Sequence, residues 1–195
     1  MFDADADILR FACEQASTTF SDGFCLEVGV CTGTSINFIS ALLPKKIIYG
    51  FDSFTGLPED WVRPDVTFKA GIFGLKSKFL DQDVVPIFVL RNVKLFKGWF
   101  INVLPQFKKE IMKDSPISFL HIDCDIYQST KDVFDSIGGN IVPGTIILFD
   151  EIYNYAGFEV HELKAFLEFL AIKKLGCEFI AYNSMHQQAV VRITV

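Results

Sequence analysis

The sequence predicts a single α/β domain built on a seven-stranded, mostly parallel sheet with an antiparallel last strand and helices on both faces. Short apolar runs alternate with stretches of helical spacing along most of the 195 residues, which is typical of a parallel sheet. Two strand-like runs follow one another at the end of the chain and indicate an antiparallel hairpin at one edge. A composition that is 50% hydrophobic, with 21 phenylalanines, is that of a globular protein.

The first half of the chain begins with a short helix over 4–20, which has apolar positions at helical spacing. The apolar run 24–28 predicts a strand, and 35–43 predicts a helix that stops before a proline. A second strand is expected over 46–52. The region 53–86 is punctuated by glycine and proline and rich in phenylalanine, so we expect a lid over the site.

The middle of the chain continues the alternation. A strand is expected over 87–96, and a helix over 100–113 whose proline we place near its first turn. The run 117–123 predicts a buried strand. A helix over 129–137 follows, with Ser129 or Thr130 as its expected N-cap residue.

The last elements are the clearest. A strand is expected over 143–150, and the apolar spacing of 158–174 predicts an amphipathic helix. The runs 177–182 and 187–195 predict the terminal hairpin.

Charge and composition exclude several classes of function. A net charge of -6 without a long basic run argues against a nucleic-acid partner. No apolar stretch approaches the roughly 20 residues that span a bilayer. Five cysteines without a CxxC spacing indicate reduced thiols, and the acidic beginning of the chain is unlike a signal peptide. We therefore expect a cytoplasmic protein with no membrane partner.

Three carboxylates follow buried strands. Asp123 ends one apolar run, and Asp150 and Glu151 end another. The carboxyl ends of parallel strands meet at one edge of a sheet, where α/β folds bind their ligands. These acids would repel one another unless a divalent cation or a shared proton held them together. An ordinary helix-capping role for Asp123 is the alternative.

The turn after the first strand is the second candidate site. Gly29 allows a sharp turn, and the following helix start offers free N–H groups. The G-x-G-x-x-G fingerprint of dinucleotide sites is absent, because Cys31 stands at its second glycine. Glu27 suits a cationic amine, and Asp52, at the end of the second strand, suits ribose hydroxyls. S-adenosylmethionine has these parts; the alternative is that both acids are ordinary loop or capping residues.

Five segments resemble the macrocin-type, metal-dependent sugar O-methyltransferases, which are class I methyltransferases with a Rossmann-like fold. They are LEVGVCTGTS, YGFDSFTGLPEDW, KLFKGWFINVLP, FLHIDCDIYQST and PGTIILFDEIY. The resemblance implies S-adenosylmethionine as the cofactor, Mg²⁺ on Asp123, Asp150 and Glu151, and a sugar hydroxyl or other small diol as the acceptor. The expected cofactor contacts are Glu27, Gly29, Val30, Thr34, Ser35, Asp52, Ser53, Gly98, Trp99 and Asp123.

The expected chemistry follows from the weak nucleophilicity of a sugar hydroxyl. Two adjacent hydroxyls on Mg²⁺ would become more acidic, and Asp123 would act as the catalytic base. The chain departs from the family at Glu151, where a second aspartate is usual, and in its short N-terminal region, which predicts a more open acceptor site. The family also suggests a homodimer.

Two rival functions remain open at this stage. One is an NAD-dependent oxidoreductase on a similar sheet, which the missing second glycine disfavours. The other is a non-catalytic protein that binds the cofactor or acts as a scaffold. His121 is expected to be a hydrogen-bonded core residue, and His161 to lie on the surface.

Overall fold

Seven strands form one sheet in a computed structural model that describes residues 1–19, 22–75 and 88–195. The sheet order is β5-β2-β1-β6-β7-β9-β8. Strands β5, β2, β1, β6 and β7 are parallel, and β9 runs antiparallel to both of its neighbours, β7 and β8. The bounds are Phe24–Val28 (β1), Ile48–Asp52 (β2), Val93–Lys97 (β5), Ile117–Ile122 (β6), Ile146–Phe149 (β7), Gly176–Tyr182 (β8) and Ala189–Thr194 (β9). The predicted sheet and its terminal hairpin are confirmed.

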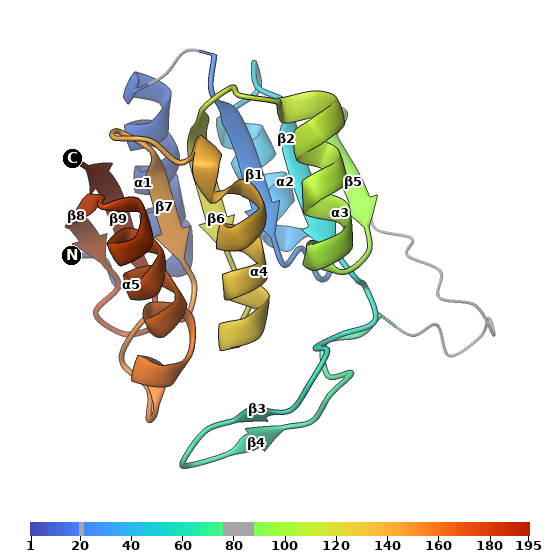
Figure 1. Ribbon diagram of the computed structural model, residues 1–195, viewed down its shortest axis with the longest axis vertical. Helices are drawn as coiled ribbons and strands as arrows, with labels where there is room; N and C mark the ends of the chain where they lie inside the picture. Colours follow the sequence, from blue (N-terminus) through green and yellow to red (C-terminus); the bar gives the residue numbers. More distant parts are fainter. Residues whose placement is uncertain (20–21, 76–87) are drawn as a thin grey trace.

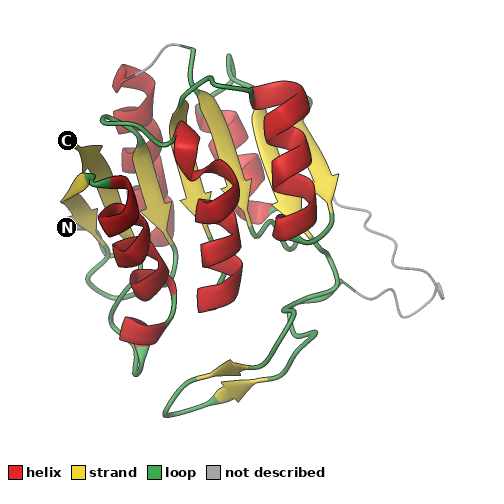
Figure 2. Cartoon of the chain, viewed as in Figure 1, coloured by secondary structure: helices red, strands yellow, loops and turns green. Residues whose placement is uncertain are grey.

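The central strands are buried on both faces. Every residue of β6 and β7 is buried, since both strands are mostly apolar and the two polar residues of β6, Ser118 and His121, are also enclosed. Figure 1 and Figure 2 show helices covering both faces of the sheet: α3, α4 and α5 lie in front, and α1 and α2 lie behind. Their bounds are Asp5–Thr19 (α1), Thr34–Leu42 (α2), Phe100–Phe107 (α3), Tyr127–Ile137 (α4) and Glu162–Lys173 (α5).

The expected lid is only partly described, because residues 76–86 lie outside the described ranges. Its described part contains a two-stranded hairpin, β3 (Trp61–Val62) and β4 (Thr67–Phe68), beyond the carboxyl ends of the parallel strands (Figure 1). Trp61 is buried and packs edge-on against Tyr155, with 5.8 Å between ring centroids. The hairpin is therefore anchored to the loop after β7.

Three local predictions were wrong in detail. Pro105 is the sixth residue of α3, and a π-helical turn over Lys108–Met112 follows it instead of a regular helix end. Proline has no N–H for an intrahelical hydrogen bond, which is compatible with such an irregular continuation. α4 begins at Tyr127, so Ser129 and Thr130 are not its N-cap; the Thr130 hydroxyl donates to the Ile126 carbonyl at 3.0 Å instead. The described residues 88–90 are not in a strand.

The beginning of the chain is docked onto the connection between β8 and β9. Phe2 forms an isolated parallel bridge with Asn183. The buried Asn183 side chain donates to Asp5 Oδ1 at 2.9 Å and to Gln188 Oε1 at 2.7 Å. Both labelled chain ends lie beside β8 and β9 in Figure 1.

No helix among the described residues is long and apolar enough to cross a lipid bilayer.

Candidate functional site

The turn after β1 is built around Gly29. Its φ of +90° is unfavourable for residues with a side chain, and a Cβ atom there would lie 1.7 Å from the Asp123 carbonyl oxygen. The Gly29 N–H donates to the Phe51 carbonyl at 2.9 Å, and the Asp123 N–H donates to the Val28 carbonyl at 3.0 Å. The ends of β1, β2 and β6 therefore meet at this glycine.

Asp52 fixes the same turn from the end of β2. Its Oδ2 accepts hydrogen bonds from the backbone N–H groups of Val30 at 2.8 Å and Cys31 at 2.7 Å. Its Oδ1 accepts one from the Phe54 N–H at 2.6 Å. Asp52 thus ties the first turn to the beginning of the lid.

Glu27 is fully buried beneath this turn and is absent from the linings of both cavities described below. The Ser35 hydroxyl donates to Glu27 Oε1 at 2.5 Å, and His121 Nδ1 lies 3.5 Å from the same oxygen. His121 is buried, as expected, with Asp150 Oδ1 3.8 Å from its Nε2, but neither ring nitrogen makes the expected hydrogen bond with a described residue. Burial opposes the charged imidazole, but the neighbouring Asp150 and Glu27 with their charges outweigh burial and raise the pKa of His121.

A first cavity of about 280 Å³ opens at the carboxyl edge of the sheet. It brings together these predicted residues: Gly29, Asp52, Ser53, Gly98, Trp99, Asp123, Asp150 and Glu151. From the lid, Leu57, Pro58 and Phe73 complete its wall. Residues that lie far apart in the sequence thus form one concave site with acids on one side.

A second cavity of about 740 Å³ lies between α1, α2 and the same sheet edge. It contains the predicted residues Val30, Thr34 and Ser35 at the start of α2. Cys31, Asp123 and Asp150 line both cavities. The predicted cofactor residues are therefore divided between two neighbouring cavities, except for Glu27, which lies beneath them.

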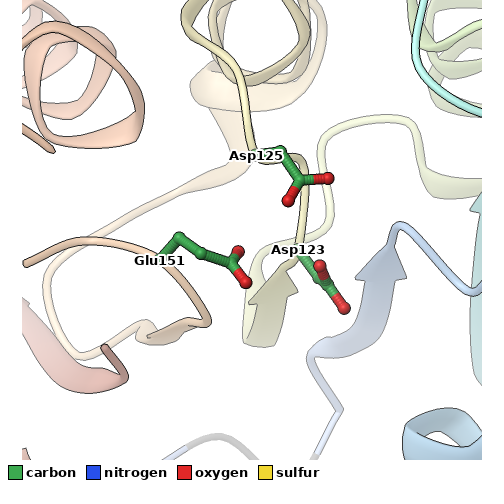
Figure 3. A group of neighbouring side chains, drawn as sticks. All are labelled: Asp123, Asp125 and Glu151. Carbon is green, nitrogen blue, oxygen red and sulfur yellow. The ribbon is translucent and has the colours of Figure 1, made fainter. Parts of the chain in front are cut away.

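Three carboxylates gather at the end of the first cavity. Oxygen atoms of Asp123, Asp125 and Glu151 all lie within 4.8 Å of one another. Figure 3 shows these side chains between the end of β6 and the loop that follows β7. Two of them belong to the predicted metal set, and Asp125 is an acid that the sequence analysis did not select.

Asp150, the third predicted metal ligand, is held beside this group. Its Oδ1 accepts a hydrogen bond from Gln188 Nε2 at 2.9 Å. Burial favours the neutral form of Asp150, but the neighbouring His121 with its charge, Glu151 and the hydrogen bond from Gln188 outweigh burial and lower the pKa of Asp150. Both the set with Asp150 and the set with Asp125 therefore stay open for a metal ion.

The acids of this group repel one another. Burial, followed by the charges of Asp150 and Asp125, raises the pKa of Asp123 well above its ordinary value. Burial and the charges of Asp150 and Asp123 raise the pKa of Glu151 in the same way. The buried Oε2 of Glu151 has no hydrogen-bond partner among the described residues. A divalent cation fits this set, because oxygen ligands and uncompensated negative charge are what such an ion requires.

The acid group predicts that the metal-free protein loses stability as the pH rises. Burial, with the charges of Asp150 and Asp52, raises the pKa of Asp125 from 3.8 to about 7. Burial likewise raises the pKa of Glu162, beneath the group, from 4.5 to about 8. Between the unfolded and folded pKa values the folded state holds more protons, so this stability is present below about pH 4 and is lost by about pH 8.

Thermal unfolding in a chelator tests this expectation. The midpoint should fall by several degrees between pH 5 and pH 8, and Asp125→Asn should reduce the fall. A midpoint that rises across this range would contradict the assignment of raised pKa values.

Two contacts of the site carried no signal in the sequence. Gln188 reaches Asp150 from the connection just before β9, and Glu162 reaches the Cys124 N–H from the start of α5. Nothing in their local patterns indicates this. Asp125 could have been found, because it stands two residues after Asp123 in the same motif. His161 was expected on the surface but is buried, with its Nε2 3.2 Å from the Val62 carbonyl oxygen.

A model of the macrocin O-methyltransferase (TylF) family matches residues 4–174. A curated relative from Streptomyces olivaceus, 8-demethyl-8-(2,3-dimethoxy-alpha-L-rhamnosyl)-tetracenomycin-C 4'-O-methyltransferase, is 23% identical over an alignment of 171 positions, which covers 74% of this chain. The chain spans 59% of the length of that relative.

Solved structures of methyltransferases share the fold. The calicheamicin methyltransferase CalS11 matches with a TM-score of 0.72 at 23% identity, covering 96% of this chain and 78% of CalS11. The O-methyltransferase NovP gives a TM-score of 0.71 at 18% identity, covering 97% and 79%. MycE, solved with Mg and SAH, gives a TM-score of 0.57 at 15% identity, covering 94% of this chain and 48% of MycE. The Rossmann-like class I methyltransferase fold is confirmed.

Proposed function

Because the chain belongs to the macrocin O-methyltransferase family, we propose that it transfers a methyl group from S-adenosylmethionine to a hydroxyl of a sugar or similar small diol, with Mg²⁺ bound. The observation that carries the proposal is the group of Asp123, Asp125 and Glu151 in the same cavity as Gly29 and Asp52. This arrangement supports a metal ion and the nucleoside of the cofactor as neighbours in one cavity. The rhamnosyl-tetracenomycin relative and TDP-rhamnose 3'-O-methyltransferase CalS11 support a sugar acceptor.

The residues present fit the cofactor. Asp52 Oδ1 accepts one backbone hydrogen bond, so a further lone pair remains for a ribose hydroxyl. The helix α2 has Gly33 as its N-cap with no side-chain hydrogen bond, so the N–H groups at its start suit a carboxylate in the second cavity. In our proposal Ser35, held by Glu27, lies beside this carboxylate, and Gly98 and Trp99 line the nucleoside end. S-adenosylmethionine supplies an activated methyl group on a sulfonium.

The residues also fit a metal ion, which would be held by Asp123, Glu151 and either Asp125 or Asp150. Bound Mg²⁺ supplies positive charge that makes a neighbouring hydroxyl more acidic. The longer side chain of Glu151 is accommodated in this arrangement, since one of its oxygens lies within 4.8 Å of carboxylate oxygens of Asp123 and Asp125.

The chain's own residues have separate tasks in transfer. Asp123 lines both cavities, so its carboxylate can accept the acceptor's proton beside the methyl donor. Gly29 allows the backbone to approach the reacting groups closely. Leu57 and Phe73 of the lid exclude water from the first cavity. Alignment of the two substrates is the largest contribution that such a site makes.

The rival functions are less well supported. Neither the family match nor the relatives favour an oxidoreductase, and the missing second glycine also argues against one. A scaffold that had lost turnover would have no use for a group of mutually repelling, buried acids. A homodimer and the lack of a nucleic-acid partner stay predictions.

Calorimetry tests cofactor, metal and acceptor together. We expect S-adenosylhomocysteine to bind with or without Mg²⁺, and a diol such as methyl rhamnoside to bind only when Mg²⁺ is present. Asp150→Asn should leave cofactor binding intact; comparison of its Mg²⁺ affinity with that of Asp125→Asn identifies the third ligand. Tight NAD(H) binding without affinity for S-adenosylhomocysteine would overturn the proposal.

A further inference from the structure

We propose that Glu162 is a positioning residue that holds the two acid-bearing loops at the separation a metal ion requires. This inference rests on the proposed metal site and adds a residue of α5 to it. Glu162 is fully buried at the first position of α5. It lies outside the two sequence motifs that carry the acids.

The first contact is to the loop after β6. Glu162 Oε1 accepts a hydrogen bond from the Cys124 N–H at 3.0 Å, across 38 residues of sequence. Cys124 stands between Asp123 and Asp125, so this bond fixes the peptide that joins the two acids.

The second contact is the chain itself. Glu162 begins α5, eleven residues after Glu151, at the end of the connection that leads from the acids after β7 into this helix. Burial, with the charges of Asp125 and Asp150, raises the pKa of Glu162 to about 8, whereas the hydrogen bond from the Cys124 N–H acts in the opposite direction. This side chain thus ties the connection after β7 to the loop that carries Asp123 and Asp125.

The loop after β6 needs such support. Asp125 has a φ of +61°, a left-handed conformation that costs a residue with a side chain about 1 kcal/mol. The Ile126 N–H donates to the Cys124 carbonyl at 2.6 Å, which closes a tight turn. Strained residues of this kind persist where surrounding contacts determine them. Glu162 supplies the contact on the side opposite the cavity.

The position of Glu162 at the start of a helix explains how a buried carboxyl group is tolerated there. The start of a helix carries partial positive charge, which stabilises a carboxylate in the first turn. Its Oε2 and the Tyr155 hydroxyl are both buried without a hydrogen-bond partner among the described residues. A carboxylate that served only to stabilise the fold would have its second oxygen paired.

Glu162→Gln keeps the shape but replaces the carboxylate that accepts from the Cys124 N–H by a neutral amide. We expect the Mg²⁺ affinity, measured by calorimetry, to fall about 10- to 100-fold, as is usual when a residue behind a metal ligand is changed. The thermal midpoint of the metal-free protein should stay level or rise, because a buried charge is removed from an acidic cluster. Affinity for S-adenosylhomocysteine without metal should be unchanged.

Glu168→Gln is the matched control. It makes the same substitution on the same helix, at a carboxylate that accepts from the Tyr127 hydroxyl at 2.7 Å. It should leave Mg²⁺ affinity at the wild-type value. Equal Mg²⁺ affinities for Glu162→Gln and wild type would overturn the inference, as would a lowered midpoint with unchanged affinity in the folded fraction.

Hydrogen exchange of the wild-type protein tests the inference without a variant. The Cys124 amide should exchange slowly, and fast exchange there would overturn the role of Glu162. If the wild type binds no divalent cation, the proposed metal site fails instead, and this amide alone decides whether Glu162 holds the loops.

Discussion

Replacing Asp123 by asparagine is expected to lower the rate of methyl transfer by about 1,000-fold, the range typical for removal of a general base. The carboxylate lies where both cavities meet, so it can reach an acceptor hydroxyl beside the methyl donor. Asparagine keeps the shape but cannot accept the proton. The measurement is transfer of a labelled methyl group to the best acceptor of a diol panel, at saturating acceptor and cofactor.

Two observations separate this loss from misfolding. S-adenosylhomocysteine should still bind to Asp123→Asn within about tenfold of wild type, since a neutral side chain retains the cavity's shape. Asp132→Asn makes the same change at an exposed carboxylate that accepts from Gln128, and it should transfer methyl groups at the wild-type rate. Turnover of Asp123→Asn within tenfold of wild type would remove Asp123 from the role of base.

Gly29→Ala is expected to lower the free energy of unfolding by roughly 4 kcal/mol, a large value for a single substitution. The new Cβ would lie 1.7 Å from the Asp123 carbonyl oxygen, in a backbone conformation with φ +90°. The ends of β1 and β6 would have to move apart, and the first cavity would be distorted. Chemical denaturation measures the loss, and calorimetry should show weaker S-adenosylhomocysteine binding in the fraction that stays folded.

Gly71→Ala distinguishes the cost of the steric clash at Gly29 from the cost of its backbone conformation. Gly71 also has a positive φ, +80°, but the nearest atom to its Cβ would be 3.8 Å away. Only the conformational cost of about 1 kcal/mol is expected there. Equal losses at the two glycines would show that the close approach of Gly29 to Asp123 is unimportant.

The sheet was predictable because each of its strands corresponds to a short, continuous pattern in the sequence. Runs such as 117–122 and 146–149 are largely apolar, so their burial on both faces follows from the sequence, although Ser118 and His121 are polar. The first turn was predictable for a similar reason, since one glycine between a strand and a helix has few alternative roles. The π-helical turn after Pro105 was not, because its geometry depends on packing around α3 rather than on the local pattern.

The sequence could predict that acids gather at this edge of the sheet, but not which acids form the group. The ends of β6 and β7 had to bring acids together, since the two strands are adjacent and parallel. Which carboxylate of each loop points inward depends on partners from elsewhere. Gln188 donates a hydrogen bond to Asp150 and holds it beside the group. Asp125 has a left-handed backbone conformation, and its carboxylate lies within 4.8 Å of that of Glu151. Such long-range contacts leave no periodic trace in a sequence.

The docking of Asn183 against both Asp5 and Gln188 has a consequence for the order of folding. The bond between Asn183 and Asp5 joins residues 178 positions apart, and Gln188 of the same connection holds Asp150. Contacts that close so long a loop form after local ones, because their entropic cost must be met before they contribute. We therefore expect the contact between Asn183 and Asp5 to form after the sheet, and Gln188 to reach its final place beside Asp150 at the same late stage.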